Sequence, residues 1–193
     1  MSTPRNPIPP KHFAPLQSTD VKSCPRMSKP TADIALIGLA VMGQNIILNM
    51  NDHGFVVCAY NRTVAKVDQF LANEAKGTNI IGGKSLEDMV SKLKKPRRVM
   101  MLVKAGSAVD DFIDKIAPLL DQGDIIIDGG NSDVAARRWQ PRVSISSGVG
   151  SAEERDGARY GPSLMPGGAP EAWPHIKPIF QGIAAKANGE PLL

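Results

Sequence analysis

From Asp33 onward, short apolar runs alternate with amphipathic stretches along the chain. The runs are rich in β-branched residues and carry apolar side chains at adjacent positions, which is typical of strands buried on both faces of a parallel sheet. Strands of this kind are expected at Asp33–Gly38, Phe55–Tyr60, Arg98–Val103 and Asp124–Asp128, with one more at Val143–Ser146. The pattern therefore predicts a sheet covered on both sides.

Helices are expected between these strands, where apolar residues recur at a spacing of three to four. Their expected bounds are Met42–Asp52, Val64–Asn73, Leu86–Lys92 and Ala108–Leu120. Thr63 and Ser85 stand where N-cap residues belong, directly before two of the helices. The alternation of strand and helix predicts an α/β fold of the Rossmann-like, doubly wound kind, a mainly parallel sheet with helices on both faces.

The pattern weakens after Asn131. A short helix over Asp133–Trp139 would end at Pro141. The stretch rich in Gly and Ser that runs to Gly168 has little periodicity, which favours either a functional loop or disorder. The last helix contains Pro178, and because an interior proline costs about 3 kcal/mol, we expect that helix to be kinked or short.

Length and composition fit one globular domain with tails. The chain has 193 residues, of which 42% are hydrophobic and 22% charged. Residues 1–31 are expected to be a disordered, Pro-rich leader, residues 32–187 the domain, and residues 188–193 a short C-terminal tail. The net charge of +4 resides in the first 30 residues, and the remainder balances 18 basic against 18 acidic residues. A neutral domain gives no electrostatic reason to expect nucleic-acid binding.

Cysteine use and hydropathy exclude several classes of protein. Cys24 and Cys58 provide neither a disulfide framework nor metal-ligand spacing, so no metal is expected. Every apolar run is far shorter than the roughly 18 residues of a membrane span, and the N-terminus lacks the apolar centre of a secretory signal. A cytoplasmic location is expected. A transit peptide is a less favoured alternative, because seven prolines in residues 1–30 oppose an amphipathic targeting helix.

The segment Gly38–Gly43 has the pattern G-x-A-x-x-G between an expected strand and an expected helix. Gly38 permits a tight turn, Ala40 lets a pyrophosphate approach the backbone, and Gly43 lets the helix pack closely on the strand. Free N–H groups at the helix start would bind the phosphates. A glycine turn with a purely structural role is the alternative. The candidate contacts are Gly38, Leu39, Ala40, Val41, Met42 and Gly43.

The end of the second expected strand indicates which dinucleotide is bound. A chain specific for NAD offers Asp or Glu about 20 residues beyond the first glycines, to bind the ribose 2′-OH. This chain offers Asn61, Arg62 and Thr63. No carboxylate repels a 2′-phosphate there, and the planar guanidinium of Arg62 suits phosphate oxygens, so NADP is expected. Alternatively, Thr63 only caps the next helix and Arg62 is a solvated surface charge.

Two more turns follow expected strands at the carboxyl edge of the sheet, where open α/β folds bind ligands. Val103, Lys104 and Ala105 follow one strand, and Asn131 follows another after two glycines. Small residues there allow a ring or a ribose to lie against the backbone. Alternatively, Lys104 is a charge that flanks a helix, and Asn131 stabilises its own turn.

Most of residues 32–187 resembles 6-phosphogluconate dehydrogenase. The segment ADIALIGLAVMGQNIILNMNDHGFVVCAYNRTVAKVDQFLANEAKGT is similar to the opening of that family, and the similarity continues through SKLKKPRR, LVKAG, DDFI, GDIIIDGGNS, GARYGPSLMPGG, EAWPHIK and IFQGIAAK. The resemblance implies an oxidative decarboxylation in the pentose phosphate pathway. NADP takes a hydride from C3 of 6-phosphogluconate, and the 3-keto acid loses CO2 to give ribulose 5-phosphate.

The resemblance also implies roles for particular residues. Gly38–Gly43 would hold the pyrophosphate, Asn61-Arg62-Thr63 the 2′-phosphate end, and Val103-Lys104-Ala105 the nucleotide further along. Asn131 would lie between nicotinamide and substrate. Gly150, Ser151 and Ala152 stand where the family has a Ser-Gly-Gly that contacts substrate. This departure weakens the expected contact, because alanine replaces a glycine.

The family continues into an all-helical domain whose Lys general base and Glu general acid have no match in this chain. We therefore expect the helical domain to be absent, no catalytic residue among the 193, and no activity of the chain alone. The family forms homodimers largely through that domain, so the same absence removes the expected dimer contacts. Two alternatives stay open: a non-catalytic NADP-binding module and a related β-hydroxyacid dehydrogenase.

Overall fold

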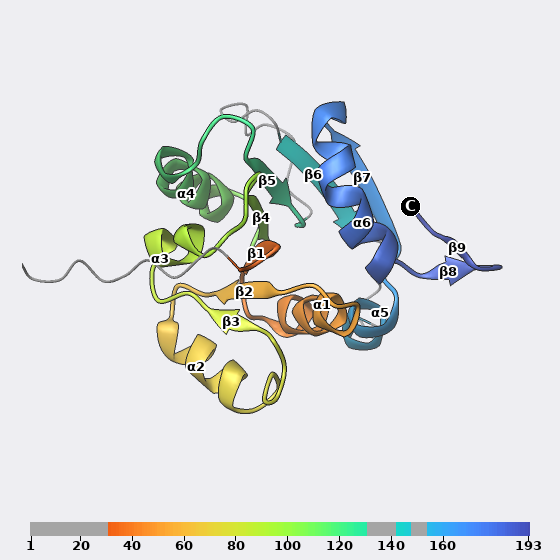
Figure 1. Ribbon diagram of the computed structural model, residues 1–193, viewed down its shortest axis with the longest axis horizontal. Helices are drawn as coiled ribbons and strands as arrows, with labels where there is room; N and C mark the ends of the chain where they lie inside the picture. Colours follow the sequence, from red (N-terminus) through yellow and green to blue (C-terminus); the bar gives the residue numbers. More distant parts are fainter. Residues whose placement is uncertain (1–30, 131–141, 148–153) are drawn as a thin grey trace, which may run out of the picture.

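Residues 31–130, 142–147 and 154–193 are described by the computed structural model. In these ranges seven strands form one sheet with the order β3-β2-β1-β4-β5-β6-β7, and a small hairpin follows near the C-terminus (Figure 1). Neighbours in the large sheet are parallel except for β6 and β7. Its strands are β1 Ile34–Ile37, β2 Val57–Tyr60, β3 Ile81–Gly82, β4 Arg98–Met101, β5 Ile125–Asp128, β6 Arg142–Ser147 and β7 Leu164–Gly168.

The helices lie between these strands along the chain. They are α1 Val41–Asp52, α2 Val64–Ala72, α3 Leu86–Ser91, α4 Ser107–Ile116, α5 Glu154–Tyr160 and α6 Trp173–Ile183, with 3-10 turns η1 Ala117–Leu119 and η2 Pro170–Ala172 and a hairpin of β8 Lys186–Ala187 and β9 Glu190–Pro191. The expected doubly wound α/β fold is confirmed. For the elements expected up to β6, observed ends differ from expected ones by at most two residues, except that α4 stops early, where Pro118 leads the chain into η1. The short strand β3 was not expected.

Successive residues of each central strand point into two separate cores. Ile34 and Leu36 of β1 belong to the core with α1, α2 and α6, whereas Ala35 and Ile37 belong to the core with α3 and α4. Figure 1 shows α3 and α4 on one side of the sheet and α1, α5 and α6 on the other. Because both faces are covered, every position of such a strand is apolar.

The expectation of a loop or disorder up to Gly168 is wrong for residues 154–168, which form α5 and β7. β7 is held by antiparallel pairing with β6, in which Pro166 is paired with Ile145. α5 packs along α1 and buries Ala158 completely. Tertiary contacts therefore override the weak local pattern. Residues 1–30 and the expected helix at Asp133–Trp139 lie outside the described residues.

The last helix, which was expected to be kinked or short, is not cut short at its proline, because α6 runs through Pro178 over eleven residues. Pro178 removes the N–H that would bond to the carbonyl of Pro174 in the first turn. Both prolines are exposed, so the missing bond falls on the outer side of the helix. Ile176 and Phe180 remain fully buried on the inner side and hold the helix to the sheet.

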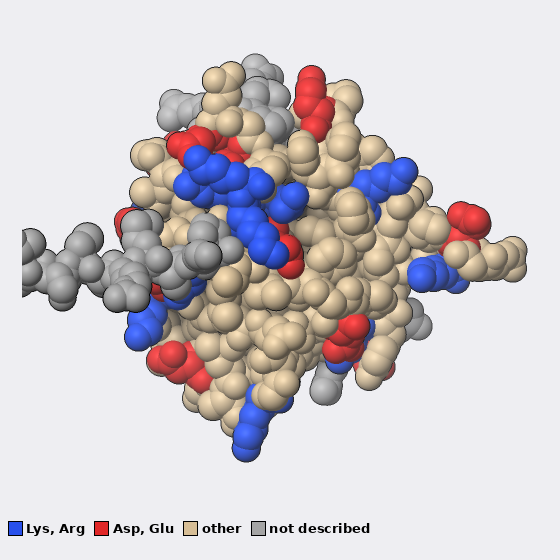
Figure 2. Space-filling view, in the orientation of Figure 1, with Lys and Arg blue, Asp and Glu red and all other residues tan. Residues whose placement is uncertain are grey.

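Charged pairs close the amino edge of the sheet. Arg97 Nη1 lies 2.8 Å from Asp124 Oδ2, and the Arg97 N–H donates to the other oxygen of this buried carboxylate at 2.7 Å. Lys94 pairs with Asp33 at 2.8 Å. Figure 2 accordingly shows basic and acidic side chains side by side over β4 and β5. These cations are neutralised within the fold.

A buried amide joins three helices. Asn49 of α1 is 1% exposed, and its Nδ2 donates to the carbonyl oxygens of Ala158 at 3.1 Å and of Ile183 at 3.2 Å. These carbonyls lie in the last turns of α5 and α6, where intrahelical partners are missing. One side chain therefore fixes both helices against α1.

Replacing Asn49 by alanine should lower the free energy of unfolding by about 1–3 kcal/mol, because two buried carbonyls lose their donor. Asn45→Ala is the matched control, since the Asn45 amide bonds only to the carbonyl of Val41 at the surface of the same helix. The control should change stability by less than about 0.5 kcal/mol. Urea unfolding measures both free energies. Equal losses of stability in the two variants would show that the bonds from Asn49 to α5 and α6 contribute no more than a surface hydrogen bond.

Candidate functional site

The turns that follow β1, β2, β4 and β5 meet at one edge of the sheet, because these strands are parallel neighbours. The chain moves outward from β1 to β2 and β3, then returns to place β4 on the other side of β1. Open α/β sheets bind ligands at such a reversal, outside the carboxyl ends of the strands. The candidate site is therefore this edge.

The turn after β1 is packed too tightly for any residue but glycine at two positions. Gly38 has φ +113°, and a Cβ there would lie 2.2 Å from the carbonyl oxygen of Leu102. A Cβ at Gly43 would lie 1.9 Å from the carbonyl oxygen of Gly38 itself. The turn therefore lies directly on the loop after β4, and α1 lies directly on the turn. The backbone is left open on its outer side, where Ala40 and Val41 are exposed.

The N-terminus of α1 has unfilled hydrogen-bonding capacity. Its N-cap residue is Ala40, which offers no side-chain acceptor, and its first turn contains no acidic residue. The first N–H groups of a helix have no intrahelical partner, and the helix dipole adds partial positive charge there. An anion placed at this end would satisfy both features, so a pyrophosphate fits the site.

α3 shows the contrasting arrangement at the same edge. Ser85 caps it, accepting the N–H of Asp88 at 3.1 Å, as expected for an N-cap residue. Thr63 occupies the N-cap position of α2, as expected, but its side chain forms no capping hydrogen bond. α2 also lacks acidic residues in its first turn, whereas α3 has Glu87 and Asp88. At this edge, α1 and α2 are therefore the helices that lack both a capping side chain and an acidic residue in the first turn, whereas α4 has Asp110 there.

Asn61 ties the end of β2 to the glycine turn. Its Oδ1 accepts the N–H of Leu39 at 3.4 Å, and its Nδ2 donates to the carbonyl of Thr63 at 3.2 Å. The N–H of Gly38 donates to the carbonyl of Tyr60 at 2.9 Å, which adds a backbone link. The amide thus occupies the position at which an NAD-specific chain carries a carboxylate.

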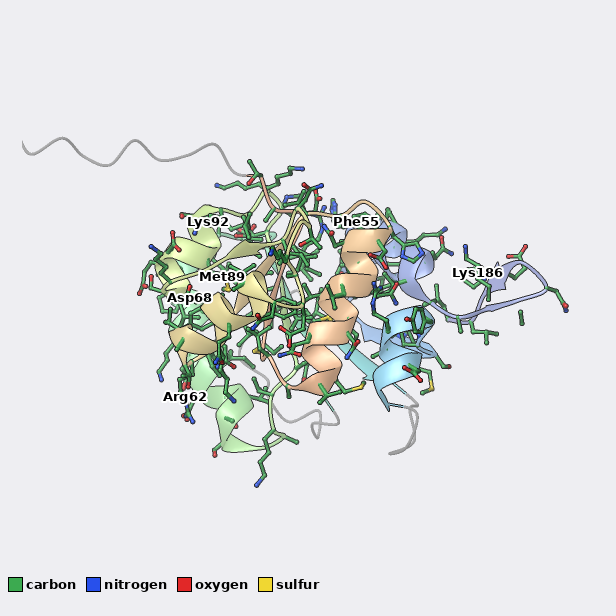
Figure 3. The ribbon with its side chains drawn as sticks, turned by 90° about the horizontal axis from the view of Figure 1, so that it is seen from below. Phe55, Arg62, Asp68, Met89, Lys92 and Lys186 are labelled. Carbon is green, nitrogen blue, oxygen red and sulfur yellow. The ribbon has the colours of Figure 1, made fainter. Side chains whose placement is uncertain are left out.

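Arg62 extends from this turn into solvent. Its side chain is exposed, and it has no ion-pair partner among the described residues. Figure 3 shows Arg62 at the opposite edge of the molecule from Phe55 and Lys92. Burial, together with the carboxylate of Glu87, raises the pKa of the neighbouring Tyr60, so the phenol stays neutral near pH 7. The local charge facing a ligand is therefore that of the guanidinium.

The turns after β4 and β5 complete the edge. The N–H of Leu102 donates to the carbonyl of Ile37 at 2.8 Å, which holds the start of the β4 turn against β1. Lys104 and Ala105 beyond it are exposed. A Cβ at Gly129 would lie 2.9 Å from Leu102 Cδ2, so the two turns touch. The structure thus brings Gly38–Gly43, Asn61-Arg62-Thr63 and Val103-Lys104-Ala105 to one edge.

Four candidate residues lie outside the described residues: Asn131, Gly150, Ser151 and Ala152. Asp128 and Gly130 lead directly up to the first of them, and the N–H of Gly130 donates to Asp128 Oδ1 at 3.1 Å. Sequence reasoning missed the contact of Asn61 with Leu39 and the approach of the Leu102 carbonyl to Gly38. Neither has a local signal, because each joins residues far apart in the chain.

The sequence profile described as the NAD binding domain of 6-phosphogluconate dehydrogenase matches residues 33–189. The chain belongs to this family. It is 73% identical to the decarboxylating 6-phosphogluconate dehydrogenase of Rattus norvegicus and 71% identical to that of Homo sapiens, each over 168 residues. These matches cover 83% of this chain and 34% of each relative, so the chain spans about a third of the length of the curated relatives it matches.

Solved structures agree with this membership of the 6-phosphogluconate dehydrogenase family. A Plasmodium falciparum 6-phosphogluconate dehydrogenase, studied in complex with its cofactor NADP+ and with its substrate 6-phosphogluconate, superposes with a TM-score of 0.69 at 36% identity. The match covers 83% of this chain and 36% of that one. A Mycobacterium tuberculosis 3-hydroxyisobutyrate dehydrogenase gives a TM-score of 0.64 at 18% identity, which shows a shared fold alone.

Metal-binding and membrane-spanning features are absent from the described ranges. No group of three or more His, Cys, Asp or Glu side chains is placed to hold a metal ion there. No helix in those ranges is long and apolar enough to cross a membrane. Burial raises the pKa of Cys58 to about 12, which keeps this thiol protonated and unreactive. The chemistry of the described part is concentrated at the carboxyl edge.

Replacing Gly43 by alanine should destabilise the domain by about 1–3 kcal/mol or more, because the methyl group would overlap the carbonyl oxygen of Gly38. Gly182→Ala in α6 is the matched control, since a Cβ there would meet Phe55 Cε2 at 3.4 Å, an ordinary contact. The control should be neutral or gain about 0.5–1 kcal/mol from the helical propensity of alanine. Thermal unfolding measures the stability of both variants. Unchanged stability of Gly43→Ala would mean that α1 can move away from the glycine turn without cost.

Proposed function

We propose that this chain is the NADP-binding part of a decarboxylating 6-phosphogluconate dehydrogenase. The observation that carries the proposal is the pairing of the uncapped N-terminus of α1 with Arg62 at the adjacent end of β2. Together they offer donors for a pyrophosphate and a permanent cation for a second phosphate, with no acidic residue in the first turns of α1 and α2. The NADP+ bound by the Plasmodium relative supports the same choice of cofactor.

Each group of residues has a distinct task in this proposal. The N–H groups that follow Ala40 bind the pyrophosphate, and the close packing at Gly38 and Gly43 keeps the backbone within reach of it. Arg62 binds the 2′-phosphate, with Thr63 beside it, and Asn61 holds that turn against the glycine turn. Val103, Lys104 and Ala105 line the path of the nucleotide further along the edge. NADP, when bound, supplies the hydride acceptor.

The full reaction is also a proposal, because the chain covers 34% of the length of its relatives. We propose 6-phosphogluconate as substrate, in line with the names of the relatives, with Asn131 between nicotinamide and substrate and residues 150–152 near it. Acid and base catalysis would come from a further domain of the longer enzyme, which would also provide most of a homodimer interface. A cytoplasmic location follows from the proposed role in soluble sugar-phosphate metabolism.

Arg62→Glu should abolish or reverse a preference for NADPH over NADH, because a carboxylate repels the 2′-phosphate and can accept a bond from a ribose hydroxyl. The expected loss for NADPH is about 1.5–3 kcal/mol, at least tenfold in Kd. Lys76→Glu is the matched control, an exposed charge reversal beyond the end of α2. Calorimetric titration with both nucleotides tests this. Equal affinities of the unmutated chain for NADPH and NADH would contradict the NADP assignment.

The 193-residue chain alone should not turn over 6-phosphogluconate, even with saturating NADP. Of its three histidines, His12 lies outside the described residues, and the other two lie at the amino edge, away from the candidate site. His53 follows the C-terminus of α1, and the carbonyl of His175 accepts from Arg98 Nε at the start of β4. Loss of general acid and base typically costs about 10²–10⁴ in rate for each group.

Absorbance of NADPH in a steady-state assay at high protein concentration measures this turnover. NADP binding is measured on the same preparation, so that a failed assay can be separated from a misfolded chain. Binding without turnover supports the proposed division of labour. Turnover at about 1–10³ per second, the range of ordinary enzymes, would show that the 193 residues are catalytically sufficient.

A further inference from the structure

The backbone of Leu39, in the glycine turn, is held from two sides by side-chain amides. Its N–H donates to Asn61 Oδ1 at 3.4 Å, and its carbonyl oxygen accepts from Gln44 Nε2 at 3.4 Å. Asn61 directly follows β2, whereas the half-buried Gln44 lies in α1. The two amides therefore connect the turn to both elements that border the candidate site.

Gln44 occupies two carbonyl groups at the start of α1. Its own N–H donates to the carbonyl of Ala40 at 3.0 Å, and its side chain bonds to the carbonyl of Leu39. Because the helix begins at Val41, the bond to Ala40 is its first regular backbone bond. The Leu39 carbonyl lies one residue before this ladder, so the side chain of Gln44 supplies the donor that the helix does not.

The bond from Gln44 also sets the direction of a free donor. A peptide group is planar and almost always trans, so its C=O and N–H point in opposite directions. While Gln44 holds the Leu39 carbonyl, the N–H of Ala40 in the same peptide group points the other way. Ala40 is exposed, and its N–H has no partner among the described residues. The turn thus presents this N–H next to the free N–H groups of the first turn of α1.

A carbonyl oxygen at this place would oppose the binding of an anion. The free N–H groups and the dipole of a helix start attract a phosphate, whereas the oxygen of a peptide group carries partial negative charge and repels it. Gln44 suits the task because its amide can donate and is uncharged. A glutamate side chain would be an acceptor only and would add a negative charge.

Ala40 restrains the same peptide group by a different means. Its φ is −81°. Reversal of the peptide group between Leu39 and Ala40 would bring this angle to a positive value, where the Cβ of alanine is crowded by the backbone. The hydrogen bond from Gln44 and the side chain of Ala40 therefore favour the same orientation.

We propose that Gln44 is a positioning residue of the nucleotide site, which keeps the Leu39 carbonyl turned away from the pyrophosphate. This inference rests on the proposed function, because it requires a dinucleotide at the start of α1. It adds a residue that the glycine pattern does not include, since Gln44 follows the last glycine of that pattern. Gln44 acts through the backbone of Leu39 and needs no contact with the ligand.

The test uses the 193-residue chain with Gln44→Met, which keeps the length and the helix propensity of the side chain but removes its donor. Gln69→Met is the matched control, the same exchange at an exposed position of α2. Each variant is titrated with NADPH, with NADH and with adenosine 2′-monophosphate, a fragment that lacks the pyrophosphate. The carbon NMR shift of the Leu39 carbonyl, measured without ligand, reports whether this group accepts a hydrogen bond.

Gln44→Met should lower the affinities for NADPH and NADH by about two- to tenfold, the factor that corresponds to one neutral hydrogen bond. The affinity for adenosine 2′-monophosphate should not change, because Arg62 binds that fragment, and the Leu39 carbonyl signal should shift. Ala40→Gly alone should lose little, since Gln44 still holds the peptide group. Combined with Gln44→Met, it should lose more than the two single variants together. The control should match the unmutated chain in every titration.

Unchanged affinity of Gln44→Met for the dinucleotides would overturn the proposal. Equal weakening of the dinucleotides and of adenosine 2′-monophosphate would also overturn it, because Gln44 would then only support the fold. Equal affinities of the unmutated chain for NADPH and NADH would contradict the NADP assignment, but a loss of both in Gln44→Met would still support a role of Gln44 at the pyrophosphate. An unmutated chain that binds neither dinucleotide would contradict the proposed function and this inference together.

Discussion

The contact between the backbone at Gly38 and the carbonyl oxygen of Leu102 is the constraint on which the rest of the site depends. With 2.2 Å between that oxygen and the place of a Cβ, the turn after β1 lies flat against the loop after β4. This glycine turn also fixes α1, because the backbone at Gly43 packs directly against the carbonyl oxygen of Gly38. Leu102 also touches Gly129 after β5. Three strand ends are therefore packed closely against one another at the same edge of the sheet.

The sequence predicted this part of the molecule well, because its signals are local. Apolar runs marked β1, β2, β4 and β5, and the glycine spacing marked the turn from Gly38 to Gly43. The sequence did not predict the elements whose formation depends on partners far away in the chain. β7, LMPGG, has poor strand propensity and exists because β6 pairs with it. α5 depends on α1 through Asn49, 109 residues from Ala158. One local signal was overlooked: Asn188-Gly189, with φ 54° and 87°, is the turn of the β8–β9 hairpin.

The N-termini of the helices at the candidate edge differ in whether a side chain of the protein caps them. α3 satisfies its own first turn through Ser85, and the N–H of Lys84 donates to Asp88. Burial would raise the pKa of Asp88, but that N–H and the Lys92 ammonium outweigh it and lower the pKa. α1 and α2 forgo such caps, at a cost of about 0.5–2 kcal/mol each. An anionic ligand can restore that stabilisation, so binding is coupled to the stability of the helices that hold it.

The same coupling reaches the last third of the chain through α1. Asn49 lies about two turns beyond the glycine turn and bonds to the ends of α5 and α6, so these helices are fixed to the element whose N-terminus lies at the candidate site. α6 is also tied to the sheet through Arg98 and the His175 carbonyl, and burial lowers the pKa of that guanidinium without discharging it. Both α5 and α6 are thus connected to the candidate edge through α1, and α6 has a second connection to the sheet through Arg98.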